Sequence, residues 1–147
     1  MPFSFINNTK DKTWNDQKII LKTIMKEAIL LKEIKSKTRV NVVLVHDDAM
    51  HEFNLHYKGK DYPTDVLTFV SDDEDSLADI IINVDACVRQ AQEYKHSIQR
   101  EFAFLFAHAL LHACGYDHDN EENESKMIQR QKELLREYPR DLKESSL

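Results

Sequence analysis

The stretch His108-Ala-Leu-Leu-His112-Ala-Cys-Gly115-Tyr-Asp117-His118-Asp-Asn120 decides how this chain folds and what it can bind. The residues leading into it, from Phe102 on, are nearly all apolar, which predicts a buried helix. Two histidines four positions apart on a helix differ by about 40° in azimuth and roughly 6 Å along the axis. Both imidazoles therefore leave the same face. Gly115 can adopt the left-handed conformation that ends a helix, so that His118 can return to the same point.

Three imidazoles that converge in this way form an open zinc site, whose fourth position is left for water or substrate. A histidine on an apolar helix can instead be an ordinary core residue that is satisfied by hydrogen bonds. Two imidazoles at ligand spacing among apolar residues, followed by a glycine turn and a third histidine, are difficult to satisfy without a metal. We therefore expect one Zn²⁺ per chain, bound by His108, His112 and His118.

Length and composition set limits on the class of protein. The 147 residues are sufficient for one domain, residues 1–147, with its own hydrophobic core. The net charge of −6 means that any attraction to a polyanion must come from a local basic patch. We expect no signal peptide, and the longest apolar stretch is too short to span a membrane. Two cysteines do not indicate a disulfide framework, which favours the cytoplasm.

Hydrophobic periodicity predicts alternating strands and helices. We expect strands at 3–6, 39–45, 66–70 and 79–84, with the last of these central in a sheet. We expect helices from 15 or 16 to about 36, from 47 or 48 to about 56, from 85 to about 95, after the cap Ser97, and from 121 to about 137, with a frayed tail after 139. Leu55 and Ile128 are assigned to inward faces. This order favours an α+β fold in which helices pack against one small mixed sheet.

Two loops differ in their charge. Residues 57–65 form a turn-rich loop with two lysines, which is either a phosphate contact or an ordinary surface loop, and composition alone favours the latter. Residues 71–76 are acidic and should lie away from any RNA path.

The residues around the predicted zinc site restrict the chemistry. A peptidase of the HExxH type has a glutamate after the first histidine as its general base, whereas this chain has Ala109. This absence argues against proteolysis. Phosphodiester cleavage in RNA needs no such base for water, because RNA supplies its own nucleophile in the 2′-hydroxyl. A zinc ion with a nearby lysine can stabilise the charge that develops on the phosphate.

The same stretch resembles the HGxLHLxGYDH signature of the YbeY family of bacterial endoribonucleases, also called ribosomal RNA maturation factors. A second block resembles the family's N-x-x-Y-R-x-K-D-x-P-T-D-V-L-S-F pattern. In addition, Ala78-Asp79-Ile80 resembles its G-D-I strand start, and Arg100-Glu101 its R-E pair. The second block reads Asn54-Leu-His-Tyr57-Lys58-Gly59-Lys60-Asp61-Tyr62-Pro63-Thr64-Asp65-Val66-Leu67-Thr68-Phe69.

The resemblance implies an α+β domain similar to zinc metallopeptidases, with zinc on His108, His112 and His118. It implies a cytoplasmic endoribonuclease specific for single-stranded RNA. The expected role is ribosomal RNA maturation, chiefly at the 3′ end of the small-subunit RNA, together with ribosome quality control. The expected partners are ribosomal RNA and the ribosome or its small subunit, with no membrane, and we expect a monomer.

Lys58 stands where the family has an arginine, and we expect it to be the catalytic residue that contacts a phosphate or stabilises developing charge. Lysine keeps the charge but loses the bidentate fork of arginine. Asp117 either orients a ligand imidazole or forms the turn, and Cys114 is expected to be a small buried residue. The alternative function is a non-catalytic ribosome-assembly factor with a structural zinc.

Overall fold

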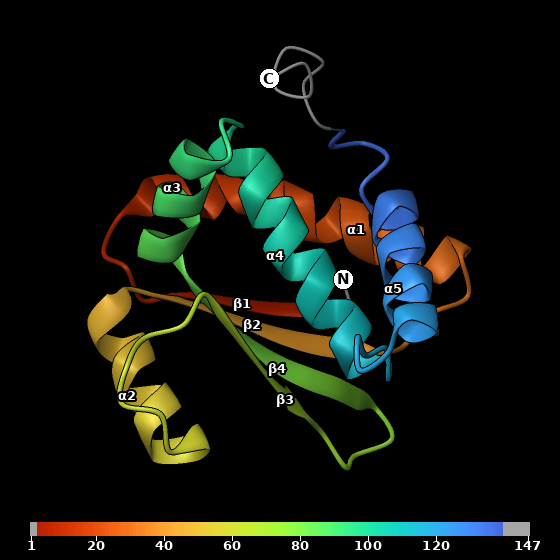
Figure 1. The fold of residues 1–147 in the computed structure, drawn as a ribbon, viewed down its shortest axis with the longest axis horizontal. Coiled ribbons are helices and arrows are strands. Elements are labelled where there is room, and N and C mark those ends of the chain that lie inside the picture. Colours follow the sequence, from red (N-terminus) through yellow and green to blue (C-terminus); the bar gives the residue numbers. More distant parts are fainter. Residues whose placement is uncertain (1–2, 140–147) are drawn as a thin grey trace.

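The computed structural model describes residues 3–139, which form one mixed sheet and its covering helices (Figure 1). The strands are β1 (Phe3–Asn7), β2 (Arg39–Val45), β3 (Val66–Val70) and β4 (Ser76–Asn83). The helices are the 3₁₀-helix η1 (Lys12–Gln17), α1 (Lys18–Leu30), α2 (Asp47–Lys58), α3 (Val84–Glu93), α4 (Ile98–Ala113) and α5 (Glu121–Leu134). The expected α+β class and the order of strands and helices are confirmed.

The sheet has the strand order β1-β2-β4-β3. β1, β2 and β4 run parallel, whereas β3 pairs antiparallel with β4. β4 is therefore an interior strand, as its nearly continuous apolar sequence predicts. β3 is an edge strand of this sheet, and it lies next to the candidate site.

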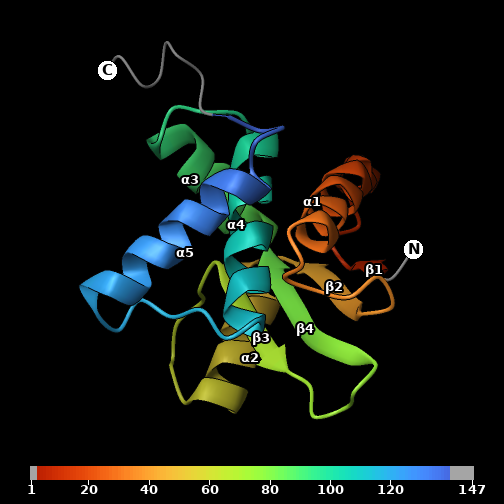
Figure 2. The ribbon, with the colours of Figure 1, turned by 90° about the vertical axis from the view of Figure 1, so that its right-hand side faces the viewer.

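The two faces of the sheet are covered unequally. Figures 1 and 2 show α1, α3, α4 and α5 on one side of the sheet and α2 on the other. Alternate residues of β2 and β4, such as Val42 and Ile80, point into the larger core with Phe102 and Phe106. Their neighbours Val45 and Ile81 pack against Met50 of α2 in a smaller cluster on the opposite face.

Helix α4 is held at both ends by local hydrogen bonds. The Ser97 hydroxyl accepts a hydrogen bond from the backbone N–H of Arg100 at 3.0 Å, as expected of an N-cap. At the other end Gly115 has φ +99°, and the N–H of Tyr116 donates to the carbonyl of Leu111 at 3.0 Å. This glycine turn redirects the chain toward the face that carries the histidines.

Several sequence-based boundaries are wrong. The first helix does not run from 15 to 36. Asp11 caps η1, and α1 ends at Leu30, just before Lys32 takes the left-handed φ of +62°. Asn83 rather than Asp85 caps α3, because its side chain accepts hydrogen bonds from the N–H groups of residues 85 and 86. β4 begins at residue 76, so the acidic loop is shorter than expected.

Two side chains assigned to inward faces are exposed. Leu55 is 48% exposed because Met50 and Asn54, four residues apart, form the inward stripe of α2. Ile128 is 46% exposed, and it lines a pocket rather than the core. The frayed tail expected after residue 139 lies outside the described residues. Within residues 3–139, no helix combines the length and apolar character needed to cross a membrane.

Candidate metal centre

His108 and His112 on α4 and His118 in the following loop form a group that could hold a metal ion. One ring nitrogen of each lies within 4.8 Å of those of the other two. The Nε2 atoms of His108 and His112 are 3.1 Å apart. Ligand nitrogens on one tetrahedral zinc, with bonds of 2.0–2.1 Å, would be about 3.3 Å apart. The separation of this pair is therefore close to what a shared ion requires.

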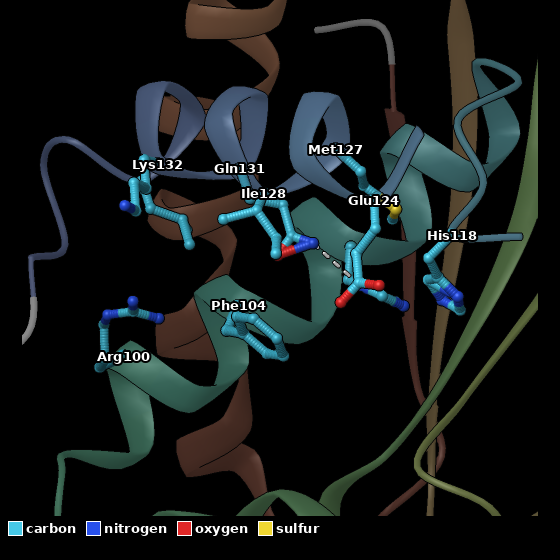
Figure 3. Close-up of a pocket in the computed structure, with 10 residues that line it drawn as sticks. Arg100, Phe104, His118, Glu124, Met127, Ile128, Gln131 and Lys132 are labelled. Carbon is cyan, nitrogen blue, oxygen red and sulfur yellow. Dashed lines mark hydrogen bonds between the residues drawn. The ribbon is translucent and has the colours of Figure 1, made fainter. Parts of the chain in front are cut away.

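Hydrogen bonds at the other ring nitrogens orient two of these imidazoles. His112 Nδ1 lies 3.1 Å from the carbonyl oxygen of Tyr116, which can only accept, so Nδ1 carries the proton and Nε2 keeps its lone pair. His108 Nδ1 lies 3.0 Å from the side-chain amide of Gln131, which is buried on α5 (Figure 3). A half turn of that amide presents its oxygen to Nδ1–H, which is the arrangement needed when Nε2 binds a metal.

The environment favours the neutral form of His108. Burial, followed by the positive charge that His112 would carry, lowers the pKa of His108 to about 4, although Asp65 acts in the opposite direction. His108 is therefore neutral at pH 7. Metal binding requires neutral imidazoles, so this ligand need not lose a proton first.

The histidines lie in a cavity of about 700 Å³ between α4, β3 and the loop of residues 59–65. Lys58, Lys60 and Asp65 line the same cavity. Lys58 is the last residue of α2, before Gly59 with φ +70°. Its ammonium lies 5.3 Å from the centroid of the Phe69 ring, which keeps the charge at the wall of the cavity.

Two buried asparagines hold the loop that borders this cavity. Asn54 donates a hydrogen bond from its side chain to the carbonyl of Tyr62 at 2.8 Å. Asn83 donates from its side chain to the carbonyl of Thr64 at 3.0 Å, and from its backbone to the carbonyl of Asp65 at 2.9 Å. These hydrogen bonds hold the backbone of residues 62–65 in place beside the histidines, and none of them involves a metal ligand.

Sequence reasoning missed Gln131 and Asp65 as neighbours of the histidines. A signal for Gln131 was available, because it is a polar residue in the apolar stripe of Met127 and Leu134. Asp117 was expected either to orient a ligand imidazole or to form the turn. Its carboxylate accepts a hydrogen bond from the backbone N–H of His118 at 2.7 Å. Asp117 thus forms the turn, whereas Tyr116 and Gln131 contact the ligand imidazoles.

Cys114, next to the glycine turn, is partly buried rather than fully buried as expected, and it packs against the larger core. Burial raises the pKa of its thiol to about 11, so it is protonated at neutral pH. Its sulfur lies 3.9 Å from the carbonyl oxygen of Glu33. Cys114 is absent from the ligand group found among the described residues.

Four other histidines lie outside the ligand group, among them His46 and His96. His46 Nε2 is 2.9 Å from the Thr9 carbonyl and Nδ1 is 3.0 Å from Asp85, and both hydrogen bonds raise the pKa of His46. His96 Nε2 is 2.6 Å from the carboxylate of Glu101, and both side chains are buried. These pairs join elements of the fold and do not border the cavity described above.

Known proteins of one family are similar to this chain over most of its length. The family model described as Endoribonuclease YbeY matches residues 4–139. Endoribonuclease YbeY of Acholeplasma laidlawii is 38% identical over 92% of this chain and 95% of that relative. The protein of the same name from Bacillus subtilis is 41% identical over 71% of this chain and 75% of its own. The solution structure of TM1509 from Thermotoga maritima is similar with a TM-score of 0.61 and 30% identity, covering 92% of this chain and 91% of that one.

Proposed function

Because the chain belongs to the Endoribonuclease YbeY family, we propose that it is a zinc-dependent endoribonuclease specific for single-stranded RNA. We further propose that it acts in the cytoplasm as a monomer on the ribosome or its small subunit. There it matures ribosomal RNA, chiefly the 3′ end of the small-subunit RNA, and contributes to ribosome quality control. The observation that carries the proposal is the placement of three converging imidazoles and Lys58 in one open cavity.

The roles of the residues follow from their positions. His108, His112 and His118 would hold the ion. Its positive charge would stabilise the negative charge that develops on the phosphate during cleavage. Lys58, which lines the same cavity, would contact a phosphate oxygen and add a second cation. The 2′-hydroxyl of the substrate serves as nucleophile, so that the chain needs no HExxH glutamate.

The cavity also has the composition of a site for single strands. Lys58 and Lys60 supply cations, and Tyr62, which is 53% exposed, offers a ring on which a base can stack. Proteins that bind single-stranded nucleic acids combine these two features. The net charge of −6 makes such a local arrangement necessary, because the chain as a whole repels RNA.

The alternative, a non-catalytic assembly factor with a structural zinc, fits this geometry less well. Structural zinc sites are usually closed by four protein ligands. The ligand group found in residues 3–139 has three members, and His118 is exposed. A structural role would be favoured if removal of the metal unfolded the protein while Lys58→Ala left ribosomal RNA processing unchanged in cells.

The proposal is tested with purified protein whose metal content has been measured. Wild type should cleave single-stranded RNA in preference to duplex RNA, and a chelator or His112→Ala should abolish cleavage. Restoring Zn²⁺ should restore activity to wild type but not to the variant. Equal cleavage by wild type and His112→Ala, insensitive to chelator, would identify a contaminant and remove the support for a nuclease. In cells, loss of the gene should leave unprocessed 3′ ends on the small-subunit RNA, and Lys58→Ala should do the same.

A further inference from the structure

A second cavity opens on the other side of the histidines. It has a volume of about 410 Å³ and lies between α4 and α5 (Figure 3). His108, His118 and Phe104 line both this cavity and the larger one that contains Lys58. A strand of RNA lying across the histidines would therefore have a cavity on each side. We call this second cavity the α4–α5 pocket.

The α4–α5 pocket has an apolar wall and a cationic end. The Phe104 ring is stacked against His108 with centroids 5.8 Å apart and an angle of 26° between the planes. The guanidinium of Arg100 lies 5.9 Å from the centroid of Phe104. Figure 3 shows Arg100 and Lys132 together at the end of the pocket far from His118, with Ile128 between the two ends. An aromatic ring, an exposed aliphatic side chain and two cations suit a nucleotide.

A negative charge at one end of the pocket and positive charges at the other would orient a bound nucleotide. Glu124 also lines it, and Figure 3 shows this carboxylate on the side of the pocket toward His118, away from Lys132. A phosphate would be repelled at the Glu124 end and attracted at the Lys132 end. The carboxylate can instead accept a hydrogen bond from a ribose hydroxyl or a base amino group. The volume is within the range of about 300–1000 Å³ that small-molecule sites occupy.

We propose that the α4–α5 pocket binds one nucleotide of the RNA, adjacent to the phosphate that is cleaved at the histidines. Its base lies against Phe104 and Ile128, and its distal phosphate lies at Arg100 and Lys132. Together with Lys58 and Lys60 on the other side, the pocket aligns the strand across the metal centre. This inference rests on the proposed function, because it identifies where part of that substrate binds.

Lysine variants on α5 test the phosphate contact. Lys132→Gln removes the charge at the pocket, whereas Lys126→Gln removes the same charge from a lysine of α5 that lies outside the pocket and pairs with Glu122 at 3.3 Å. The probe is a single-stranded 2′-O-methyl RNA, which lacks the nucleophile, and binding to zinc-loaded protein is measured by fluorescence anisotropy. Lys132→Gln should weaken binding several-fold and reduce the slope of log K against log salt by about 0.7, the value for one phosphate contact. Lys126→Gln should change neither.

Two exposed isoleucines test the base contact. Ile128→Asp places a carboxylate in the pocket, and Ile19→Asp makes the same change on α1, where the side chain is 62% exposed. We expect about tenfold weaker binding for the first and less than twofold for the second, because a carboxylate at position 128 replaces the apolar contact to the base and repels the neighbouring phosphates. Wild type should also bind about tenfold more weakly to a probe that lacks one base next to the cleavage position. This loss should occur only when the missing base is on the side that enters the α4–α5 pocket.

The outcomes separate this inference from the proposed function. If wild type cleaves RNA but Lys132→Gln and Lys126→Gln bind it equally, the α4–α5 pocket is not a nucleotide site and the nuclease assignment stands. An abasic residue that has no effect on either side would also overturn the base contact. If wild type neither binds nor cleaves single-stranded RNA, the proposed function itself fails.

Discussion

Replacing Gln131 with methionine should weaken zinc binding without unfolding the protein. The amide of Gln131 is the side-chain partner of His108 Nδ1, at 3.0 Å. The residue is buried, with 8% of its surface exposed. Methionine fills a similar volume and is a good helix former, so the packing of α5 against α4 should persist. The loss is then confined to the hydrogen bond that orients the ligand imidazole.

The expected magnitude follows from this contact. Removing such a partner of a ligand histidine typically costs 10- to 100-fold in metal affinity, which corresponds to about 1.4–2.8 kcal/mol. Gln131→Glu should retain most or all of the affinity, because a carboxylate also accepts a hydrogen bond from Nδ1–H. Gln129→Met, on the exposed side of the same helix, is the matched control and should bind zinc as wild type does.

The assay is competition for Zn²⁺ with a chromophoric chelator at pH 7.5, with urea unfolding of the metal-free variants measured in parallel. Affinity of Gln131→Met within twofold of wild type would refute the role assigned to Gln131. So would a Gln131→Glu variant that binds more weakly than Gln131→Met. Unfolding data that place Gln131→Met far below wild type in stability would mean that the side chain acts on the fold rather than on the ligand.

Three further predictions concern turnover and stability. Lys58→Ala should lower kcat/KM for single-stranded RNA by about 100-fold and Lys58→Arg should not, as measured in steady-state cleavage assays; equal rates for all three proteins would exclude Lys58 from the reaction. Hydrogen bonds to a backbone carbonyl and a carboxylate raise the pKa of His46 above 6.5, so its stabilising contribution is complete below pH 6.5 and is lost as pH rises through the folded-state value. Urea unfolding should therefore show a stability difference between wild type and His46→Gln that shrinks between pH 6 and pH 9, and a constant difference would contradict this assignment. Glu101→Ala should lower the free energy of unfolding by about 3 kcal/mol, because it removes the buried partner of His96; a loss below about 1 kcal/mol would show that the pair contributes little.

Local rules explain why much of the fold could be predicted. The pairing of His108 with His112 depends only on the helical period, and the return of His118 depends on the glycine turn at residue 115. Strand residues such as those of β2 and β4 alternate or run apolar over a few positions, and this pattern is readable without a partner. Helix ends were less accurate. For α1 the end depends on a left-handed residue, Lys32, that carries no glycine or proline signal.

Which residues can meet within one helix and its following turn is readable from their order in the chain, because backbone geometry over a few residues sets those distances. Which distant residues surround them depends on the packing of separate elements. Gln131 reaches His108 because α5 packs on α4, and Lys58 shares the cavity because α2 and its loop are tied to β4 through Asn83. Ile128 lines a pocket, although its helical position suggests the core, for the same reason. Contacts between separate elements depend on how their faces fit and on the closure of the loops between them, which no local period encodes.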